Sequence, residues 1–282
     1  MRVYLSVDME GIGGISHHAP TGRGDDGYPA AVQLMVGEAN AAIDGAFAGG
    51  ATEVVVNDSH GYMFNLVPAD LDPRAVVIQG QKPWSMVEGA RPAGGAKPFD
   101  VALFVGYHAR AGHPTGTIAH TYSGAPTLTT LDGRPVGESG INASVLGQWG
   151  IPVGLVTGDD ALAAEIETWL PWAERVVVKT GISRAAAASV HPSAARHLVR
   201  AGAERAVRRA ANGELQLLRV KPPVTIEVEY VDAGTADHAA VVPGAERYGD
   251  RGVRFTAPDA ETAYRGFLAG IRLAAAALAP LR

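Results

Sequence analysis

Two acidic residues lie close together near the amino terminus. Asp8 and Glu10, in the segment SVDMEG, follow the apolar run Val3–Leu5, which is typical of a buried strand. In an extended backbone, residues two apart point to the same side, so the two carboxylates can converge on one point. Like charges this close need a neutralising partner. A pair of metal ions shared by the two carboxylates would supply it.

Histidine and further carboxylate side chains follow at similar places in the chain. His60 in NDSHG and His108 in GYHAR each come just after an apolar strand-like run, and ligands bind beyond the carboxyl ends of parallel strands. His120 in GTIAHT and Glu138 in GESGIN, at the start of a predicted helix, come next. The chain has no cysteine, so only His, Asp and Glu can hold a metal such as zinc. We therefore expect a metal site at one edge of the sheet.

Other kinds of site fit the sequence less well. The segment EGIGGIS lacks the third spaced glycine of a dinucleotide fingerprint, and polar residues through Tyr28 delay the helix that should receive the pyrophosphate. Ser139 lacks the Gly-x-Ser-x-Gly spacing of a serine hydrolase. Asp159 and Asp160 also follow a strand, but Asp159 is equally suited to cap a helix that starts at Ala161.

Composition and charge narrow the class of protein. The 282 residues carry a net charge of −5, and 19% of them are charged, as in an ordinary globular protein. The basic segment Arg196–Arg209 has the spacing of one amphipathic helix without aromatic residues to stack on bases, so no nucleic-acid partner is expected. No run is long and apolar enough to span a bilayer, and MRVYLSVD enters a strand directly, so we expect no membrane partner and a cytoplasmic location.

The order of apolar runs predicts the fold. Short β-branched runs alternate with helical patterns over the first two-thirds of the chain, which is typical of βαβ units. The fold class is α/β, with a mostly parallel, Rossmann-like three-layer sheet flanked by helices and a smaller C-terminal α+β part. We place an α/β metal-binding catalytic domain at 1–181 and the smaller part at 182–282. Strands are expected at Val3–Asp8, Glu53–Asp58, Val76–Gln79, Val101–Tyr107, Val153–Thr157 and Arg175–Lys179.

Several further elements are expected outside these strands. A helix that includes Met35–Phe47 should pack on the sheet, and TLTTLDGRP predicts a hairpin over Thr127–Pro135. A second helix is expected at about His191–Ala211. Strands at Leu215–Val220 and Val224–Tyr230, one more strand and a terminal Ala-rich helix complete the chain.

Four motifs together resemble a known family. SVDMEG at 6–11, NDSHG at 57–61, GYHA at 106–109 with GHPTGTIAHT following, and GESGINA at 137–143 are similar to segments of the DppA-type zinc D-aminopeptidases. They occur in the family's order and at similar spacing, and the similarity covers most of the chain. An ordered set of this kind is far more specific than any single motif.

The resemblance implies a dinuclear zinc site. It implies Asp8 as the bridging ligand, Glu10 on one ion, and His60, His108 and Glu138 completing the coordination. It also implies a catalytic role for the histidine at position 120, a short peptide substrate with a D-residue at its amino end, and a ring-like homo-oligomer, a decamer in the type member.

The residues themselves leave other functions open. The same ligands could serve a different dinuclear hydrolase, such as an amidase or a phosphoesterase. A non-catalytic protein that binds metal and peptide would need the same residues and would show no turnover when loaded with zinc.

Overall fold

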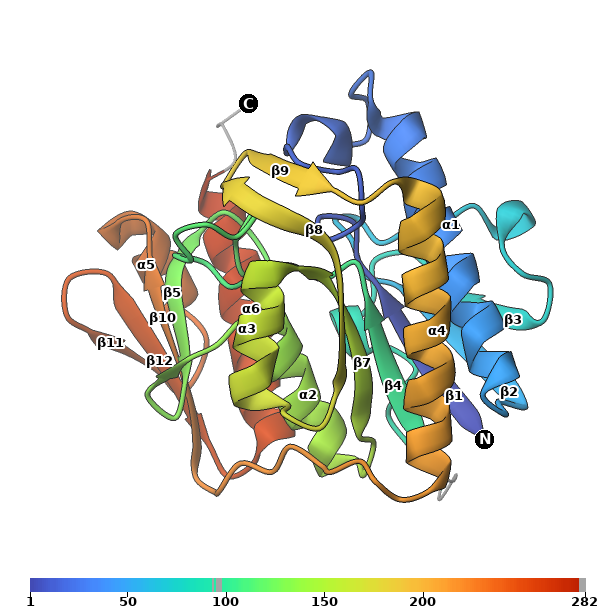
Figure 1. Ribbon diagram of the computed structural model, residues 1–282. Helices are drawn as coiled ribbons and strands as arrows, with labels where there is room; N and C mark the ends of the chain where they lie inside the picture. Colours follow the sequence, from blue (N-terminus) through green and yellow to red (C-terminus); the bar gives the residue numbers. More distant parts are fainter. Residues whose placement is uncertain (93, 95–97, 279–282) are drawn as a thin grey trace.

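The computed structural model describes residues 1–92, 94 and 98–278, and its strands form two sheets (Figure 1). The larger sheet has seven strands in the order β3-β2-β1-β4-β7-β8-β9. All neighbours in it run parallel except β8 and β9. The strands are β1 (Arg2–Val7), β2 (Glu53–Asp58), β3 (Ala75–Ile78), β4 (Val101–Val105), β7 (Val153–Asp159), β8 (Glu174–Ser183) and β9 (Ala186–Ser189).

Helices cover both faces of this sheet. Successive side chains of β1 point to opposite faces and are apolar on both, so both faces must be covered. Val3, Leu5 and Val7 pack in one apolar cluster with α1 (Tyr28–Ala48) and α4 (Pro192–Ala211), which lie side by side in Figure 1. Tyr4 points to the opposite face, into a cluster with α2 (Glu138–Gln148) and α3 (Asp160–Trp169). The predicted three-layer α/β fold is confirmed.

The second sheet is antiparallel and has five strands in the order β11-β12-β10-β5-β6. The predicted hairpin forms β5 and β6, and its turn residues Asp132 and Gly133 have φ values of 49° and 77°, as a two-residue type I′ turn requires. Helices α5 and α6 pack on this sheet. The elements are β5 (Pro126–Leu131), β6 (Arg134–Pro135), β10 (Val224–Tyr230), β11 (Ala245–Tyr248), β12 (Gly252–Ala257), α5 (Ala233–Ala239) and α6 (Ala260–Leu278).

One predicted element is wrong. Leu215–Val220 is not a strand; the segment is irregular and leads to β10. Leu215 and Leu218 are partly buried against the two apolar clusters, so the apolar pattern reflects side-chain packing and not strand pairing. Short 3-10 helices lie at Ala19–Thr21, Pro68–Asp70 and Ser85–Val87.

The division at residue 181 stays a prediction. Elements on each side of residue 181 pack with the other part of the chain. Strand β5 precedes residue 181 and pairs with the later strand β10, while α4 follows residue 181 and packs on the larger sheet.

The arginines of α4 form surface ion pairs, such as Arg200 with Asp44 and Arg205 with Glu174. Among the described helices, none combines the length and the apolar character needed to cross a bilayer.

Candidate metal centre

Three neighbouring parallel strands deliver acidic and histidine side chains to one edge of the larger sheet. Asp8 follows β1 directly and Glu10 lies two residues further on, while His60 follows β2 and His108 follows β4. Strand β1 lies between β2 and β4, so the three loops that follow these strands are adjacent. All four side chains are buried.

The buried groups are within contact distance of one another. The Nδ1 atom of His60 lies 2.9 Å from Oε2 of Glu10 and 3.3 Å from Oδ1 of Asp8. The Nε2 atom of His108 lies 3.5 Å from Oδ2 of Asp8 and 3.3 Å from Oε1 of Glu138. Each oxygen of Asp8 therefore faces a different histidine, which places this carboxylate at the middle of the cluster.

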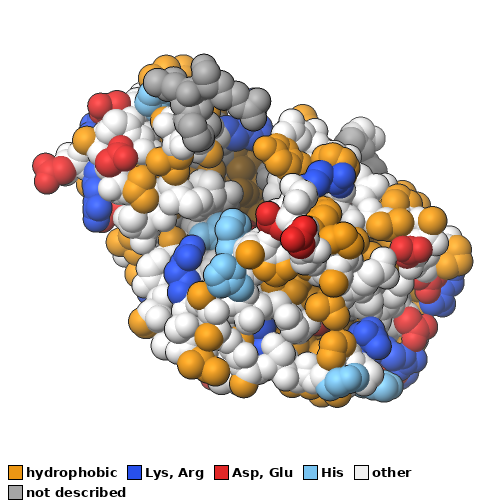
Figure 2. Space-filling model, turned by 90° about the horizontal axis from the view of Figure 1, so that it is seen from above, with side chains coloured by type: hydrophobic (Ala, Val, Ile, Leu, Met, Phe, Trp, Pro, Cys, Tyr) orange, Lys and Arg blue, Asp and Glu red, His pale blue; other side chains and the backbone are white. Residues whose placement is uncertain are grey.

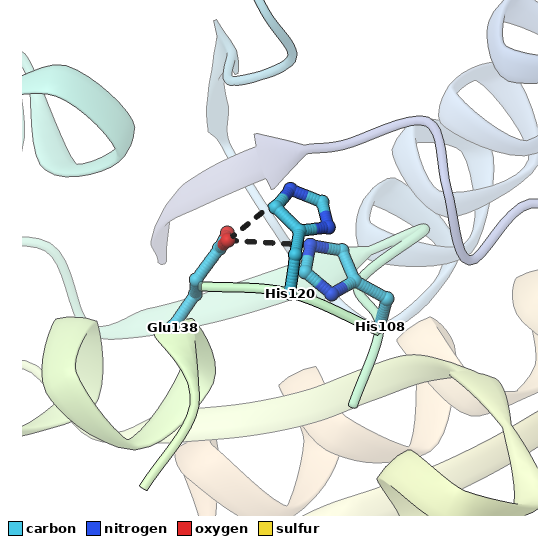
Figure 3. Close-up of side chains that lie close together, drawn as sticks. All are labelled: His108, His120 and Glu138. Atoms are coloured by element: carbon cyan, nitrogen blue, oxygen red, sulfur yellow. Dashed lines mark ion pairs between the residues drawn. The ribbon is translucent and has the colours of Figure 1, made fainter. Parts of the chain in front are cut away.

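His120 and Glu138 lie beside His108 and complete the cluster (Figure 3). The Nε2 atom of His120 lies 3.9 Å from Oε1 of Glu10 and 3.8 Å from Oε1 of Glu138. Its ring stacks on that of His108, with 4.0 Å between the centroids. Glu138 is the first residue of α2, and its Oε1 also accepts a hydrogen bond from the main-chain N–H of Tyr122, at 2.6 Å.

The outer nitrogen of each imidazole is bonded to a main-chain carbonyl. Nε2 of His60 lies 2.9 Å from the carbonyl oxygen of Thr21. Nδ1 of His108 lies 3.0 Å from the carbonyl oxygen of Ala109. Nδ1 of His120 lies 2.8 Å from the carbonyl oxygen of Ile118. A carbonyl can only accept, so each outer nitrogen carries the proton. In the neutral rings the lone pair is therefore on the inner nitrogen, which points at the carboxylates, as in histidine ligands of metals.

Burial and mutual charge set the protonation of the centre. Burial and the neighbouring Glu10 charge raise the pKa of Asp8 to about 8. Burial alone would lower the pKa of His108, but the facing carboxylates outweigh it and raise that pKa to about 10. The pKa of His60 is raised for the same reason. Burial and the nearby His108 lower the pKa of His120, so this ring is neutral at pH 7.

These donors fit a metal of the zinc class. Asp8, Glu10 and His108 offer ligand atoms within 4.8 Å of one another, and so do His108, His120 and Glu138. Nε2 of His108 is buried and has no hydrogen-bond partner among the described residues. Nitrogen and carboxylate ligands without thiolates suit zinc, and a metal ion would take the place of the protons on the inner nitrogens.

Tight backbone contacts hold the first and third of these loops together. Gly11 donates its N–H to the carbonyl of Gly106, at 2.8 Å. A Cβ atom on Gly11 would lie 1.8 Å from the carbonyl oxygen of Tyr107, and one on Gly106, which has a φ of +71°, would lie 2.3 Å from that of Asp8. Only glycine allows the two backbones to approach this closely at these two positions.

The sequence analysis missed two buried groups that position the ligands. The Lys179 ammonium, on β8, donates to the main-chain carbonyls of Glu10, Ile12 and Ile15. The carboxylate of Glu165, on α3, accepts from the N–H groups of Arg110 and Gly137, which lie next to ligand-bearing segments. Lys179 is the last residue of the predicted strand Arg175–Lys179, but a lysine is not among the metal ligands that the sequence pattern singled out, and Glu165 lies within a helix and in no motif.

Several other candidates lie outside the cluster. The Asp58 carboxylate accepts from the N–H groups of Asn65 and Leu66 and so stabilises the loop after β2. Asp159 caps α3, with its Oδ1 2.8 Å from the N–H of Leu162, as predicted. The remaining histidines outside the cluster are exposed or partly buried, namely His17, His18, His113, His191, His197 and His238.

The cluster lies on the wall of a cavity of about 1180 Å³. Figure 2 looks down on the end of the sheet where the strands finish, and shows histidine, basic and apolar side chains around a hollow. Segments that follow β1, β2 and β3 line the cavity together with the loop that carries His120. Apolar residues of α6, including Leu268 and Ile271, form another part of the wall. The cavity has room for a short peptide beside the cluster.

Comparison with known proteins identifies the family. The profile of the peptidase M55 family, the D-aminopeptidases, matches residues 1–269. The chain belongs to this family. A D-aminopeptidase of Bacillus subtilis (strain 168) is 39% identical, and the match covers 97% of this chain and 98% of that protein.

A solved structure of the family has the same fold. It is the Zn-dependent D-aminopeptidase DppA from Bacillus subtilis, described as a self-compartmentalizing protease. It matches this chain with a TM-score of 0.90 and 36% sequence identity, and the match covers 100% of both chains. The resemblance inferred from the four motifs is confirmed.

Proposed function

We propose that this protein is a dinuclear zinc aminopeptidase that hydrolyses short peptides with a D-residue at the amino end. Membership of the D-aminopeptidase family supports the reaction class. The observation that carries the metal chemistry is the arrangement of the imidazoles, each with its outer N–H on a main-chain carbonyl and its inner nitrogen toward buried carboxylates. This is the donor set of a hydrolytic zinc site.

We assign the roles of the ligands from their places in the cluster. Asp8 is the bridging ligand, because its two oxygens face His60 and His108. Glu10 joins His60 on one ion, and Glu138 joins His108 on the other. These residues would hold zinc, which when bound would supply an activated water and polarise the scissile carbonyl.

His120 is the catalytic group in this proposal. Its Nδ1–H is held by the carbonyl of Ile118, so its Nε2 is free to accept a proton and return it. Burial lowers the pKa of His120, which favours the neutral ring that can accept a proton. A carboxylate of the cluster or a metal ion would hold the free α-amino group, which accounts for cleavage after one residue.

The likeness to a self-compartmentalizing protease supports a homo-oligomer for this chain as well. A decamer and a cytoplasmic location remain predictions, and the mass of the assembly in solution tests the first.

The first experiment measures zinc per chain together with turnover of D-Ala-D-Ala and L-Ala-L-Ala. We expect about two zinc ions and a preference for the D-peptide that chelation abolishes and zinc restores. The Asp8→Ala variant should lose both ions, because it removes the bridge. Two zinc ions without turnover of either peptide would exclude the aminopeptidase, and a scan of amides and phosphate esters would then identify another hydrolase. Full activity in Asp8→Ala would exclude the bridging assignment.

A further inference from the structure

A buried lysine lies on the cavity wall outside the metal cluster. Lys82 is 7% exposed and lines the cavity, in the segment that follows β3. The other basic side chains on the same wall, Arg23, Arg184 and Arg272, are exposed. Lys82 is therefore the basic residue of this wall whose charge is shielded from solvent, where an ion pair with a ligand is strongest.

The Lys82 ammonium retains free donors. Its one hydrogen bond to the described part of the chain goes to the main-chain carbonyl of Asp58, at 2.6 Å. An ammonium has three N–H groups, so two are left for a ligand. The Asp58 carboxylate is already bonded to the amides of Asn65 and Leu66, and no ion pair joins it to Lys82. A buried charge without an ion-pair partner is costly, and a ligand carboxylate would offset that cost.

The segment that carries Lys82 is held in place by its main chain. The carbonyl of Lys82 accepts from the N–H of Ser85, at 3.2 Å, and from Nη2 of Arg272, at 2.8 Å. Ser85 has a φ of 52°, and its own carbonyl accepts from the side-chain amide of Asn57, at 3.1 Å. The position of the lysine is therefore set before any ligand binds.

Lys82 and the metal cluster share one cavity and one loop of the chain. Lys82 lines the cavity together with Asp8, Glu10 and His60. It bonds to the carbonyl of Asp58, which precedes the proposed ligand His60 by two residues, so the same segment holds the lysine and a ligand. A short peptide cleaved at the cluster therefore has its terminal carboxylate in the cavity that Lys82 lines.

We propose that the Lys82 ammonium binds the C-terminal carboxylate of the substrate and so makes the protein selective for dipeptides and tripeptides. This inference rests on the proposed aminopeptidase function. The carboxylate pairs with the two free N–H groups, and the substrate side chains lie toward Leu268 and Ile271 of α6. Longer peptides would place an amide, not a charge, beside Lys82, and would bind more weakly.

The test measures binding separately from turnover. The probe is a D-Ala-D-Ala analogue whose scissile amide is replaced by a methyleneamine, prepared as the free acid and as the C-terminal amide. Calorimetry gives the Kd of each for the zinc-loaded wild-type protein and for the Lys82→Met, Lys82→Arg and Arg184→Met variants. Zinc content and melting temperature establish that each variant is folded, and Lys82→Gln replaces Lys82→Met if the latter is not.

We expect the wild-type protein to bind the acid about 10- to 100-fold more tightly than the amide, the range for one charged hydrogen-bonded pair. Lys82→Met should lose this preference, Lys82→Arg should keep part of it, and Arg184→Met, which removes an exposed charge from the same wall, should keep it. Equal affinity of the wild-type protein for both probes, or an undiminished preference in Lys82→Met, would overturn the proposal. Turnover of D-Ala-D-Ala is measured in parallel, so a protein that prefers the acid through Lys82 but does not cleave peptides would refute the proposed function alone.

Discussion

At the scale of single residues, the outer hydrogen bond of each histidine decides what its inner nitrogen can do. The N–H held by a carbonyl fixes the ring orientation and the tautomer, so in the neutral ring the lone pair faces the centre. His60 and His108 each face two carboxylate oxygens at 3.5 Å or less, whereas those nearest His120 are at 3.8 and 3.9 Å. Because of this difference, we expect His60 and His108 to be metal ligands and His120 to carry a proton.

The His120→Ala variant tests this separation. We expect it to keep the zinc content of the wild-type protein and to lose about 10²- to 10⁴-fold in kcat, the range for an acid–base group. Metal analysis and steady-state kinetics on D-Ala-D-Ala measure the two quantities. His238→Ala, at an exposed position on α5, is the control and should match the wild-type protein. Loss of zinc from His120→Ala would show that the residue is a ligand.

At the scale of elements, the centre depends on how closely the loops after β1 and β4 approach each other. The approach is possible because Gly11 and Gly106 have no side chains at the contact. A bulkier residue would separate Asp8 from His108, which lie 3.5 Å apart and are proposed to hold the same ion. The distance between Asp8 and His108 therefore depends on the backbone contact between the two loops.

The Gly11→Ala variant should be strongly destabilised and poor in zinc. Its Cβ would clash with a carbonyl oxygen at 1.8 Å, which only a backbone shift can relieve. Overpacking typically costs about 1–3 kcal/mol, and a clash with backbone belongs at or above the upper end of that range. Thermal unfolding and metal analysis check this. Gly234→Ala is the control, because the nearest atom to its Cβ would be 3.4 Å away, and it should change stability by less than about 0.5 kcal/mol. Equal melting temperatures for the two variants would show that the contact at Gly11 does not require glycine.

At the scale of the whole molecule, buried charges make stability depend on pH. Glu38, on α1, accepts from the N–H of Gly13 through Oε1, at 2.8 Å, while its buried Oε2 has no partner among the described residues. Burial raises the pKa of Glu38 to about 7, and the Gly13 hydrogen bond and the Lys179 charge oppose this only in part. Since the folded protein binds the proton more tightly than the unfolded chain, this residue makes stability fall as pH rises from about 4.5 to 7.

The Glu38→Gln variant should remove this pH dependence. The free energy of unfolding of the variant, relative to that of the wild-type protein, should be larger at pH 7.5 than at pH 5. The size of the pKa shift sets the expected increase at up to about 3 kcal/mol. Burial lowers the pKa of Lys179 to about 8. Below that pH the lysine stays largely protonated, so it adds little to the pH dependence of stability in this range. Melting temperatures of the two zinc-loaded proteins at both pH values give the comparison. Glu167→Gln, at an exposed position of α3, is the control, and an equal difference at both pH values would refute the assignment.

The linear order of residue types determined much of the site. A carboxylate or histidine that follows an apolar β-branched run must lie at the carboxyl edge of a parallel sheet, so Asp8, His60 and His108 could be placed together before any coordinates. Short apolar, β-branched runs also predicted the strands of the larger sheet, and the turn residues Asp132 and Gly133 predicted the hairpin. These signals are local, and each is complete within a few residues of the chain.

Other features depend on contacts between distant segments. Lys179 reaches carbonyls more than a hundred residues earlier in the chain, and Lys82 contacts Asp58, the last residue of β2, only once the sheet has formed. Leu215–Val220 has the apolar pattern of a strand, yet it is irregular, because Leu215 and Leu218 are partly buried against the two apolar clusters and the segment pairs with none of the described strands. The sequence by itself was enough to predict which residues carry the chemistry, since their types and spacing are local. Only the tertiary structure decided which nitrogen faces the centre, which buried charges lie beside it and which buried lysine lines the cavity, since these follow from distances between segments far apart in the chain.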